Sequence, residues 1–282
     1  MKLRYLVSKL VCIGAASGSA CAQEQAGGRL EPLGEGVSAA AASIMPEDYL
    51  RKLGVIAHDS MGGRDTPSPG LEMTASWIAS EFERMGLVPA GDDGSYVQRY
   101  VIETVGPDQF RQSVSAPNVA GILEGSDPLL KEEYVVFSAH MDHVGIGTPN
   151  AEGDSIFNGA DDDGSGTTAV LEIAEAYASL ATRPKRSMIF LLVSGEEKGL
   201  WGSAHFAENP PVPTDRMVAD LNIDMVGRNW PDTIAAIGME HSDLGATLRL
   251  VSEAHPELGM TAIDDIWPEE RFYFRSDHYN FA

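Results

Sequence analysis

The order of apolar segments in this chain predicts an α/β fold of three layers, with helices on both faces of a central sheet. Short, strongly apolar segments of strand type alternate with longer segments whose apolar residues recur at helical spacing. In such a fold the loops that follow the strands meet at one edge of the sheet, where functional side chains are expected to gather. With 282 residues, of which 43% are hydrophobic, the chain can bury one large core.

The first 22 residues have the pattern of a cleavable export signal and not of a folded segment. Three basic residues are followed by a short apolar stretch and a small-residue cleavage site, namely Lys2, Arg4 and Lys9, then residues 10–20, then Ala20-Cys21-Ala22. A lipoprotein cleavage at Cys21 is less favoured, because Gly18 stands where a larger aliphatic residue is expected. We therefore expect a signal peptide over residues 1–22 and a secreted or periplasmic protein.

Charge and cysteine content narrow the possible functions. The net charge of −22 argues against nucleic acid or an anionic membrane as a partner. No segment after the signal reaches the ~20 apolar residues that span a bilayer. Both cysteines, Cys12 and Cys21, lie in the signal segment, so the mature chain would hold no disulfide and no thiolate. Any metal ligands must then be nitrogen or oxygen.

The mature chain divides into a leader and one domain. Residues 23–45 are rich in Ala, Gly and Ser without a period, and predict a flexible leader. A helix begins at Pro46, and a stronger one ends at Gly86, with apolar residues at helical spacing from Met73. The other expected helices lie at about 164–181, from 199, and at 244–255; the expected strands lie at about 96–102, 118–123, 134–139, 187–194, 217–224 and 233–237.

Five short segments each offer a possible metal ligand where a predicted strand ends or a helix begins. They carry His140, Asp162, Glu196–Glu197, Asp224 and His278. Two imidazoles and three carboxylates can bind a pair of divalent metals, and one glutamate is left over as a base. The set predicts a co-catalytic metallohydrolase.

The surroundings of the first histidine fit this prediction. His140 follows the apolar run 134–137 and so emerges at the end of a buried strand. Asp142 lies on the same face of an extended segment, where it can accept the other ring N–H of His140 and fix its tautomer. His143 points to the opposite side from Asp142, and we expect it to be packed or solvated. Taken alone, His140 is also compatible with a packed residue.

The acidic segments leave alternatives open. Three adjacent carboxylates at 161–163 repel one another, so a bound cation is one reason for them; favourable interaction with the dipole of the following helix is another. Glu196 and Glu197 leave a strongly apolar strand, which makes two merely exposed loop acids a weaker interpretation. Adjacent glutamates can divide the labour, since one binds a metal while its neighbour moves a proton.

Taken in order, the patterns H-x-D, G-A-x-D-x-x-S-G, E-E, N-x-D and S-D-H resemble those of peptidase family M28, the zinc exopeptidases that include secreted bacterial aminopeptidases. The resemblance covers about residues 46–282. It implies a mixed, mostly parallel sheet of the zinc-exopeptidase type, two zinc ions per chain, and peptide substrates with a free N-terminus.

The resemblance also implies a role for each residue. Asp162 would bridge the two zinc ions, Glu197 and His278 would complete one site, and His140 and Asp224 the other. Glu196 would be the general base, and Asp142 the partner that orients His140. Two zinc ions ~3.5–4 Å apart can share a water whose pKa falls to near 7.

Two departures from the family pattern are visible. In the family the S-D-H motif is followed by a further strand and a closing helix, whereas this sequence stops at Ala282, so the resemblance implies C-terminal incompleteness. Many members carry an additional domain before the first metal histidine, but the interval 101–118 is too short for one. We therefore expect one catalytic domain over residues 46–282. We expect Tyr273 to be a packed aromatic, and no donor for the reaction's oxyanion is assigned.

Other functions fit the sequence less well. A glutaminyl cyclase of the same fold would work with one zinc ion, and the complete second set with His140 and Asp224 disfavours it. A catalytically inactive, peptidase-fold binding protein would be expected to lose ligands, and all are present. The G-x-S-x-G motif of serine hydrolases and the H-E-x-x-H motif of other zinc proteases do not occur.

Overall fold

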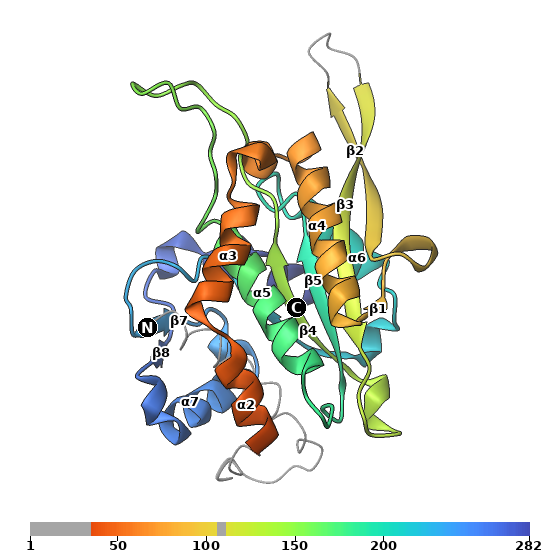
Figure 1. Ribbon diagram of the computed structural model, residues 1–282, viewed down its shortest axis with the longest axis vertical. Coiled ribbons are helices and arrows are strands. Elements are labelled where there is room, and N and C mark those ends of the chain that lie inside the picture. Colours follow the sequence, from red (N-terminus) through yellow and green to blue (C-terminus); the bar gives the residue numbers. More distant parts are fainter. Residues whose placement is uncertain (1–34, 106–110) are drawn as a thin grey trace.

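The computed structural model describes residues 35–105 and 111–282, so the predicted signal peptide lies outside the described residues. At its centre is a six-stranded mixed sheet in the order β1-β3-β5-β4-β6, with β2 also paired to β3 (Figure 1). The strands are β1 (Val88–Pro89), β2 (Val97–Val105), β3 (Arg111–Leu123), β4 (Tyr134–His140), β5 (Ser187–Val193) and β6 (Met217–Asn222). The α/β class expected from the alternating pattern is confirmed.

The sheet has an antiparallel half and a parallel half. Strand β3 pairs antiparallel with β1, β2 and β5, whereas β4 runs parallel to both β5 and β6. In the parallel half, His140 lies opposite Val193 and Ser138 lies opposite Asn222. Because three parallel strands end at nearly the same level, the residues that follow them lie side by side at one edge.

Helices cover both faces of the sheet, as the three-layer prediction requires. One face carries α3 (Pro46–Ile56), α4 (Pro69–Met85) and α5 (Gly164–Ala178), and the other carries α6 (Trp201–Glu208) (Figure 1). Alternate residues of β4 point to opposite cores: Val135 and Phe137 pack towards α5, and Val136 packs with Phe206 of α6. This period of two explains why the central strands read as continuous apolar runs.

Helix α4 begins and ends at the signals that its sequence carries. The Ser68 side chain accepts a hydrogen bond from the backbone N–H of Leu71, and Pro69 occupies the first turn, where a missing N–H costs nothing. Gly86 ends the helix with φ of 73°, a left-handed conformation that glycine adopts without a steric penalty.

Part of the segment expected to be a flexible leader is instead helical. Helix α2 (Glu35–Ser43) covers its second half, and Ala40, Ala41 and Ile44 are buried in the core shared with α5. The alanine run has a high helix propensity, and burial of its small side chains stabilises the helix further. The prediction was wrong here because the absence of an apolar period does not exclude an alanine helix.

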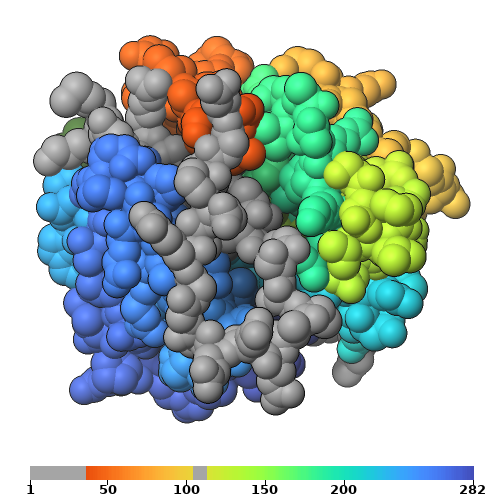
Figure 2. Space-filling model, turned by 90° about the horizontal axis from the view of Figure 1, so that it is seen from below, coloured from red at the N-terminus to blue at the C-terminus, as the bar shows by residue number. Residues whose placement is uncertain are grey.

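The C-terminal third adds a small second layer beside β6. Strands β7 (Thr233–Ala235) and β8 (Thr261–Ile263) pair in parallel, and α7 (Leu244–Ala254) packs on them. In Figure 2 this segment, coloured blue, forms one side of the molecule, while the green helix α5 lies towards the other. None of the helices in the described ranges is both long and apolar enough to cross a membrane.

A buried ammonium joins the helices of the first layer. The side chain of Lys52 is fully buried, and its Nζ lies 2.6 Å from Glu172 and 2.6 Å from Glu175 of α5. Asp48 is a third partner at 2.8 Å. Burial opposes the charge on Lys52, but these carboxylates hold its pKa above the usual value. The pairs therefore fix α3 on α5.

Replacing Lys52 with Met tests this junction. Burial raises the pKa of Glu172 to about 7. Below that pH the folded protein holds this carboxyl in its protonated form, so removal of the Lys52 charge lowers the stability only a little. Above pH 7 the wild-type protein keeps the ion pair between Lys52 and Glu172. The variant must instead bury an unpaired Glu172 carboxylate or keep that carboxyl protonated. We expect a stability loss of about 3–5 kcal/mol at pH 9 and a smaller one at pH 6, measured by urea denaturation. Equal losses at both pH values would contradict this account.

Candidate metal centre

The predicted ligands converge at the carboxyl edge of the parallel strands. His140 ends β4, Glu196 and Glu197 follow β5, Asp224 follows β6, and Asp162 lies just before α5. All five side chains line one cavity of about 1370 Å³, whose opposite wall comes from β7, α7 and the C-terminal residues. The register of β4 with its two neighbours thus brings together residues up to 84 positions apart in sequence.

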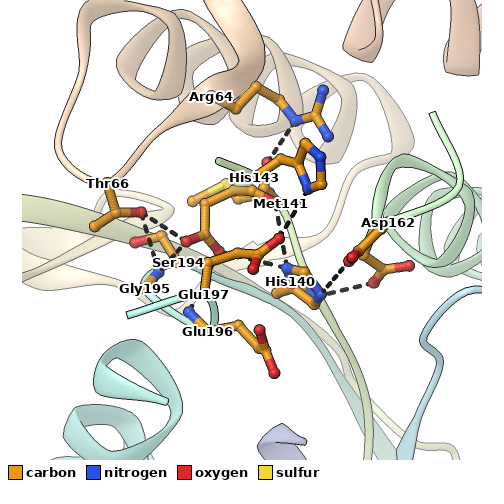
Figure 3. Close-up of polar contacts among 12 residues, drawn as sticks. Arg64, Thr66, His140, Met141, His143, Asp162, Ser194, Gly195, Glu196 and Glu197 are labelled. Atoms are coloured by element: carbon orange, nitrogen blue, oxygen red, sulfur yellow. Dashed lines mark hydrogen bonds and ion pairs between the residues drawn. The ribbon is translucent and has the colours of Figure 1, made fainter. Parts of the chain in front are cut away.

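One ring nitrogen of His140 faces two carboxylates, and the other ring nitrogen contacts Asp142. Its Nε2 lies 3.3 Å from Asp162 Oδ1 and 3.7 Å from Asp224 Oδ1 (Figure 3). Its Nδ1 lies 3.2 Å from the carbonyl oxygen of Asp142 and 3.5 Å from the Asp142 carboxylate. Burial opposes a charge on His140, but the surrounding carboxylates hold its pKa well above the usual value. The site therefore favours positive charge at the place that Nε2 faces.

Asp142 connects two of the ligand loops. Its fully buried carboxylate accepts hydrogen bonds from the hydroxyl of Thr66 at 2.8 Å and from the backbone N–H of Gly195 at 2.8 Å. The backbone N–H of Glu196 is a weaker donor at 3.4 Å. One carboxylate thus fixes the orientation of His140 and also the start of the loop that carries Glu196, which is more than the predicted contact with the histidine.

The three adjacent aspartates, Asp161, Asp162 and Asp163, make different contacts. Asp163 is fully buried and accepts backbone N–H groups of Gly166, Met225 and His140, at 2.8, 3.1 and 3.2 Å. Asp161 accepts the backbone N–H of Gly227 and pairs with Arg228. Because its neighbours are taken up by these contacts, Asp162 is the one of the three that faces His140 and the cavity. Asp163 thus caps the N-terminus of α5, as the helix interpretation of the run expects, whereas a metal-binding role for Asp162 stays a prediction.

The glycine after this run allows α5 to begin directly under the site. A Cβ at Gly166 would lie 1.9 Å from the carbonyl oxygen of Ile223 and 2.5 Å from Asp163 Oδ1. No side chain fits there, so the helix N-terminus can approach the loop of Asp224 only with glycine. The G-S-G part of the motif is explained by this close packing.

A second group of possible ligands contains a residue that we did not expect. His143 Nδ1 lies 2.8 Å from Glu197 Oε1, and donor atoms of His143, Asp162 and Glu197 all lie within 4.8 Å of one another (Figure 3). The expectation that His143 is merely packed or solvated was wrong. The strand-like alternation ends at Asp142, since the N–H of His143 turns to bond the carbonyl of Arg64 at 3.3 Å.

Glu196 and His278 line the cavity without joining either group. Burial raises the pKa of Glu196 to about 8; the charge of His140 opposes this, and Asp277, Asp224 and Asp142 add to it. His278 packs with its ring centre 5.1 Å from that of Tyr273, and its buried Nε2 has no hydrogen-bond partner among the described residues. The ligand role of His278 stays a prediction, whereas Tyr273 is a packed aromatic in contact with the rings of His241 and Phe274.

The donor set fits divalent cations. The group His140, Asp163 and Asp224 also has donor atoms within 4.8 Å of one another, but both oxygens of Asp163 hold backbone N–H groups, which makes Asp162 the better third ligand. Asp224 Oδ1 is buried, and no residue in the described part of the chain donates a hydrogen bond to it. Buried nitrogen and oxygen acceptors that share a strongly negative pocket are the environment that binds zinc in proteins.

Comparison with known proteins places this arrangement in a family. The model of peptidase family M28 matches residues 118–282, which include every predicted ligand. The chain belongs to peptidase family M28. The family predicted from the five short patterns is thus confirmed.

Curated relatives agree with this membership. A probable zinc metalloprotease of Pyrenophora tritici-repentis is 33% identical over 164 residues, which are 58% of this chain and 32% of that protein. Another, from Pyricularia oryzae, is 32% identical over 57% of this chain and 30% of its own length. The chain therefore spans about a third of the length of the curated relatives that it matches.

The fold is shared with two enzymes of different activity. The Legionella pneumophila LapA aminopeptidase has a TM-score of 0.62 and 21% identity, covering 93% of this chain and 64% of that one. Porphyromonas gingivalis glutaminyl cyclase has a TM-score of 0.58 and 18% identity, covering 83% of this chain and 78% of that one. At these identities the likeness supports the fold, and the site must supply the chemistry.

Asp142→Asn tests the connection between the ligand loops. The amide replaces one carboxylate oxygen with an NH2 group, and each oxygen accepts a backbone N–H, that of Gly195 on Oδ2 and that of Glu196 on Oδ1, so one donor is left without a partner. We expect the metal-free variant to lose about 1–3 kcal/mol of stability in urea denaturation. Asp127→Asn is the matched control, because that carboxylate also accepts two backbone N–H groups but lies in a surface turn. Equal losses in both variants would rule out a special role for Asp142.

Proposed function

We propose that this protein is an exported zinc metallopeptidase that removes residues from the free N-terminus of peptides. Residues 46–282 form its catalytic domain, and α2 packs on that domain. The observation that carries the proposal is the position of His140 Nε2, which faces Asp162 and Asp224, with Glu197 and Glu196 on the neighbouring strand end.

The residues present can hold two zinc ions. His140, Asp162 and Asp224 would bind one, and Asp162 with Glu197 would bind the other, completed by His278 as the family resemblance implies. When bound, zinc ions at such a site lower the pKa of a shared water and polarise a carbonyl group. The metalloproteases among the relatives support zinc as the metal.

Glu196 is suited to move the proton in hydrolysis. It lies on the cavity wall beside the ligands, and its pKa, raised by burial, makes it a stronger base than an exposed carboxylate. It would take a proton from the attacking water and deliver it to the nitrogen of the leaving amine. Asp142 keeps His140 in one orientation throughout, because its contacts with Thr66 and Gly195 leave it no freedom to turn.

The negative wall of the cavity favours substrates with a protonated amine. Glu196 and Asp224 both line it, and their carboxylates make it acidic. A free α-ammonium group would supply donors to these acceptors and offset their charge, whereas an internal peptide bond offers neither. This supports an exopeptidase over an endopeptidase.

Glutaminyl cyclase activity is the second candidate, since enzymes with that activity share the fold. The group of His140 and Asp224 beside that of Glu197 favours two metals and hydrolysis. A peptide with N-terminal glutamine separates the alternatives: release of free glutamine supports the peptidase, and conversion to pyroglutamate without chain shortening supports the cyclase.

Substitution of the adjacent glutamates distinguishes their roles. Glu196→Gln should keep two zinc ions per chain while turnover falls about 100-fold or more, because the shape remains and the base is lost. Glu197→Ala should lower the zinc content, measured by elemental analysis after dialysis. Glu240→Gln, at an exposed glutamate, is the control. One zinc ion at saturation in wild type, or reversed behaviour of the two variants, would contradict the assignment.

Blocking the substrate amine tests the exopeptidase proposal. N-acetylation removes a charge-assisted contact worth about 1.5–3 kcal/mol and leaves acidic groups without a partner. We expect kcat/KM for an acetylated aminoacyl amide to fall at least tenfold below that of the free amine. Turnover of both at similar rates would point to an endopeptidase or another amide hydrolase.

The position of signal-peptide cleavage tests the proposal that the protein is exported. We expect the protein recovered outside the cytoplasm to begin at Gln23, because Ala20-Cys21-Ala22 fits the cleavage site. N-terminal sequencing of the secreted or periplasmic protein measures this directly. A full-length, uncleaved chain retained in the cytoplasm would refute the localisation.

A further inference from the structure

A buried arginine upstream of the family-matched residues lies beside the ligand loops. The segment Asp59–Arg64 forms a 3₁₀ turn between α3 and α4, and the Arg64 side chain is fully buried. The match to the family model begins only at residue 118. Burial of a guanidinium costs free energy unless its N–H groups form hydrogen bonds. The partners of these bonds therefore indicate which segments the side chain connects.

The guanidinium donates to backbone carbonyls of two ligand loops. Its Nε donates to the carbonyl of Met141 at 2.8 Å, within the sequence His140-Met141-Asp142 (Figure 3). Its Nη1 and Nη2 donate to the carbonyls of Asn158 and Gly159, at 2.6 and 2.8 Å, in the loop that leads to Asp162. A further bond of 3.0 Å reaches Ile56 at the end of α3. One planar group therefore spans three segments.

Backbone segments pack tightly around the Arg64 guanidinium. The N–H of His143 bonds the carbonyl of Arg64, and the N–H of Gly145 bonds that of Gly63 at 3.0 Å. A Cβ at Gly159 would lie 2.7 Å from Arg64 Nη2 and 2.5 Å from His143 Cγ. The two loops thus meet at the guanidinium with no space for another side chain.

The charge of Arg64 is maintained by the site itself. Burial lowers the pKa of Arg64 to about 10, while the nearby Asp142, Asp163, Asp162 and Glu197 favour its charged form. The arginine is therefore cationic at neutral pH. It lowers the mutual repulsion of these acids without occupying an oxygen that faces the cavity, since its four hydrogen bonds go to backbone carbonyls.

We propose that Arg64 is a positioning residue of the metal centre, whose guanidinium clamps the loop of His140 and Asp142 to the loop of Asp162 and so aligns the ligands before metal binds. The inference rests on the proposed zinc site. A residue that merely stabilises the fold would affect unfolding but not metal affinity. A clamp must affect both, because misaligned ligands bind the ion less tightly.

Arg64→Lys is the informative variant, because it keeps the charge and removes the planar fork that reaches two loops. The control is Lys52→Met, which removes another fully buried basic side chain, one whose partners lie in α3 and α5 and not in a ligand loop. Zinc affinity is measured by competition with a chromophoric chelator, metal-free stability by thermal unfolding, and coordination by the absorption spectrum of the Co²⁺ form.

We expect Arg64→Lys to weaken zinc binding about 10- to 100-fold and to change the Co²⁺ spectrum. Lys52→Met should lower Tm while zinc affinity stays close to that of wild type. If Arg64→Lys lowered Tm yet kept wild-type zinc affinity and Co²⁺ spectrum, the clamp would be refuted. Wild type that binds no zinc would instead refute the proposed function.

A measurement on wild type covers the case in which Arg64→Lys does not fold. If the clamp aligns the ligands in advance, backbone amides at 141–145 and 157–163 should be protected from hydrogen exchange in the metal-free protein nearly as well as in the zinc-loaded protein. Rapid exchange of these amides without zinc, and protection only on its addition, would overturn the proposal.

Discussion

The parallel register of β4 with β5 and β6 is the constraint on which the rest of the site depends. It places three strand ends at one level, so that residues from distant parts of the sequence face one another without any long loop to hold them. A shift of one residue in β4 would turn His140 to the other face of the sheet. The strongly apolar strands prevent such a shift, because each must match two separate cores.

Concentrated negative charge is the cost of this convergence, and the structure offsets it in three ways. Backbone N–H groups donate hydrogen bonds to the carboxylates of Asp163 and Asp142, which do not line the cavity. The buried guanidinium of Arg64 lies behind the loops. The remaining acceptors, on Asp162, Asp224 and Glu197, face histidine nitrogens, and Asp224 Oδ2 also accepts from the hydroxyl of Ser276. A metal ion is the natural counter-charge for that last set.

Sequence patterns predicted the elements that carry the chemistry better than the contacts that support it. The strands of the parallel half and helix α5 follow from apolar runs and periods, and the convergence of the candidate ligands follows from their positions at the ends of these elements. The roles of Thr66 and Arg64 were not predicted, because most of their partners lie 76 to 95 residues away and are mostly backbone atoms, for which no sequence pattern exists. His143 was misjudged because alternation along a strand does not continue through a turn, and α2 because an alanine helix has no apolar period.

The chain leaves the sheet at the end of β6 and comes back beside β6 and β4 only with the 3₁₀ turn Asp277–Phe281; the segment between them contributes β7 and α7 to the far wall of the cavity. Ligands and wall are thus encoded in separate stretches of sequence. Insertions, deletions or substitutions in residues 229–272 would change the size and shape of the space offered to a substrate without moving a strand end. Selectivity in this architecture can be altered independently of the chemistry, and the tolerance of that stretch to change is the property that an engineer of new specificity would use first.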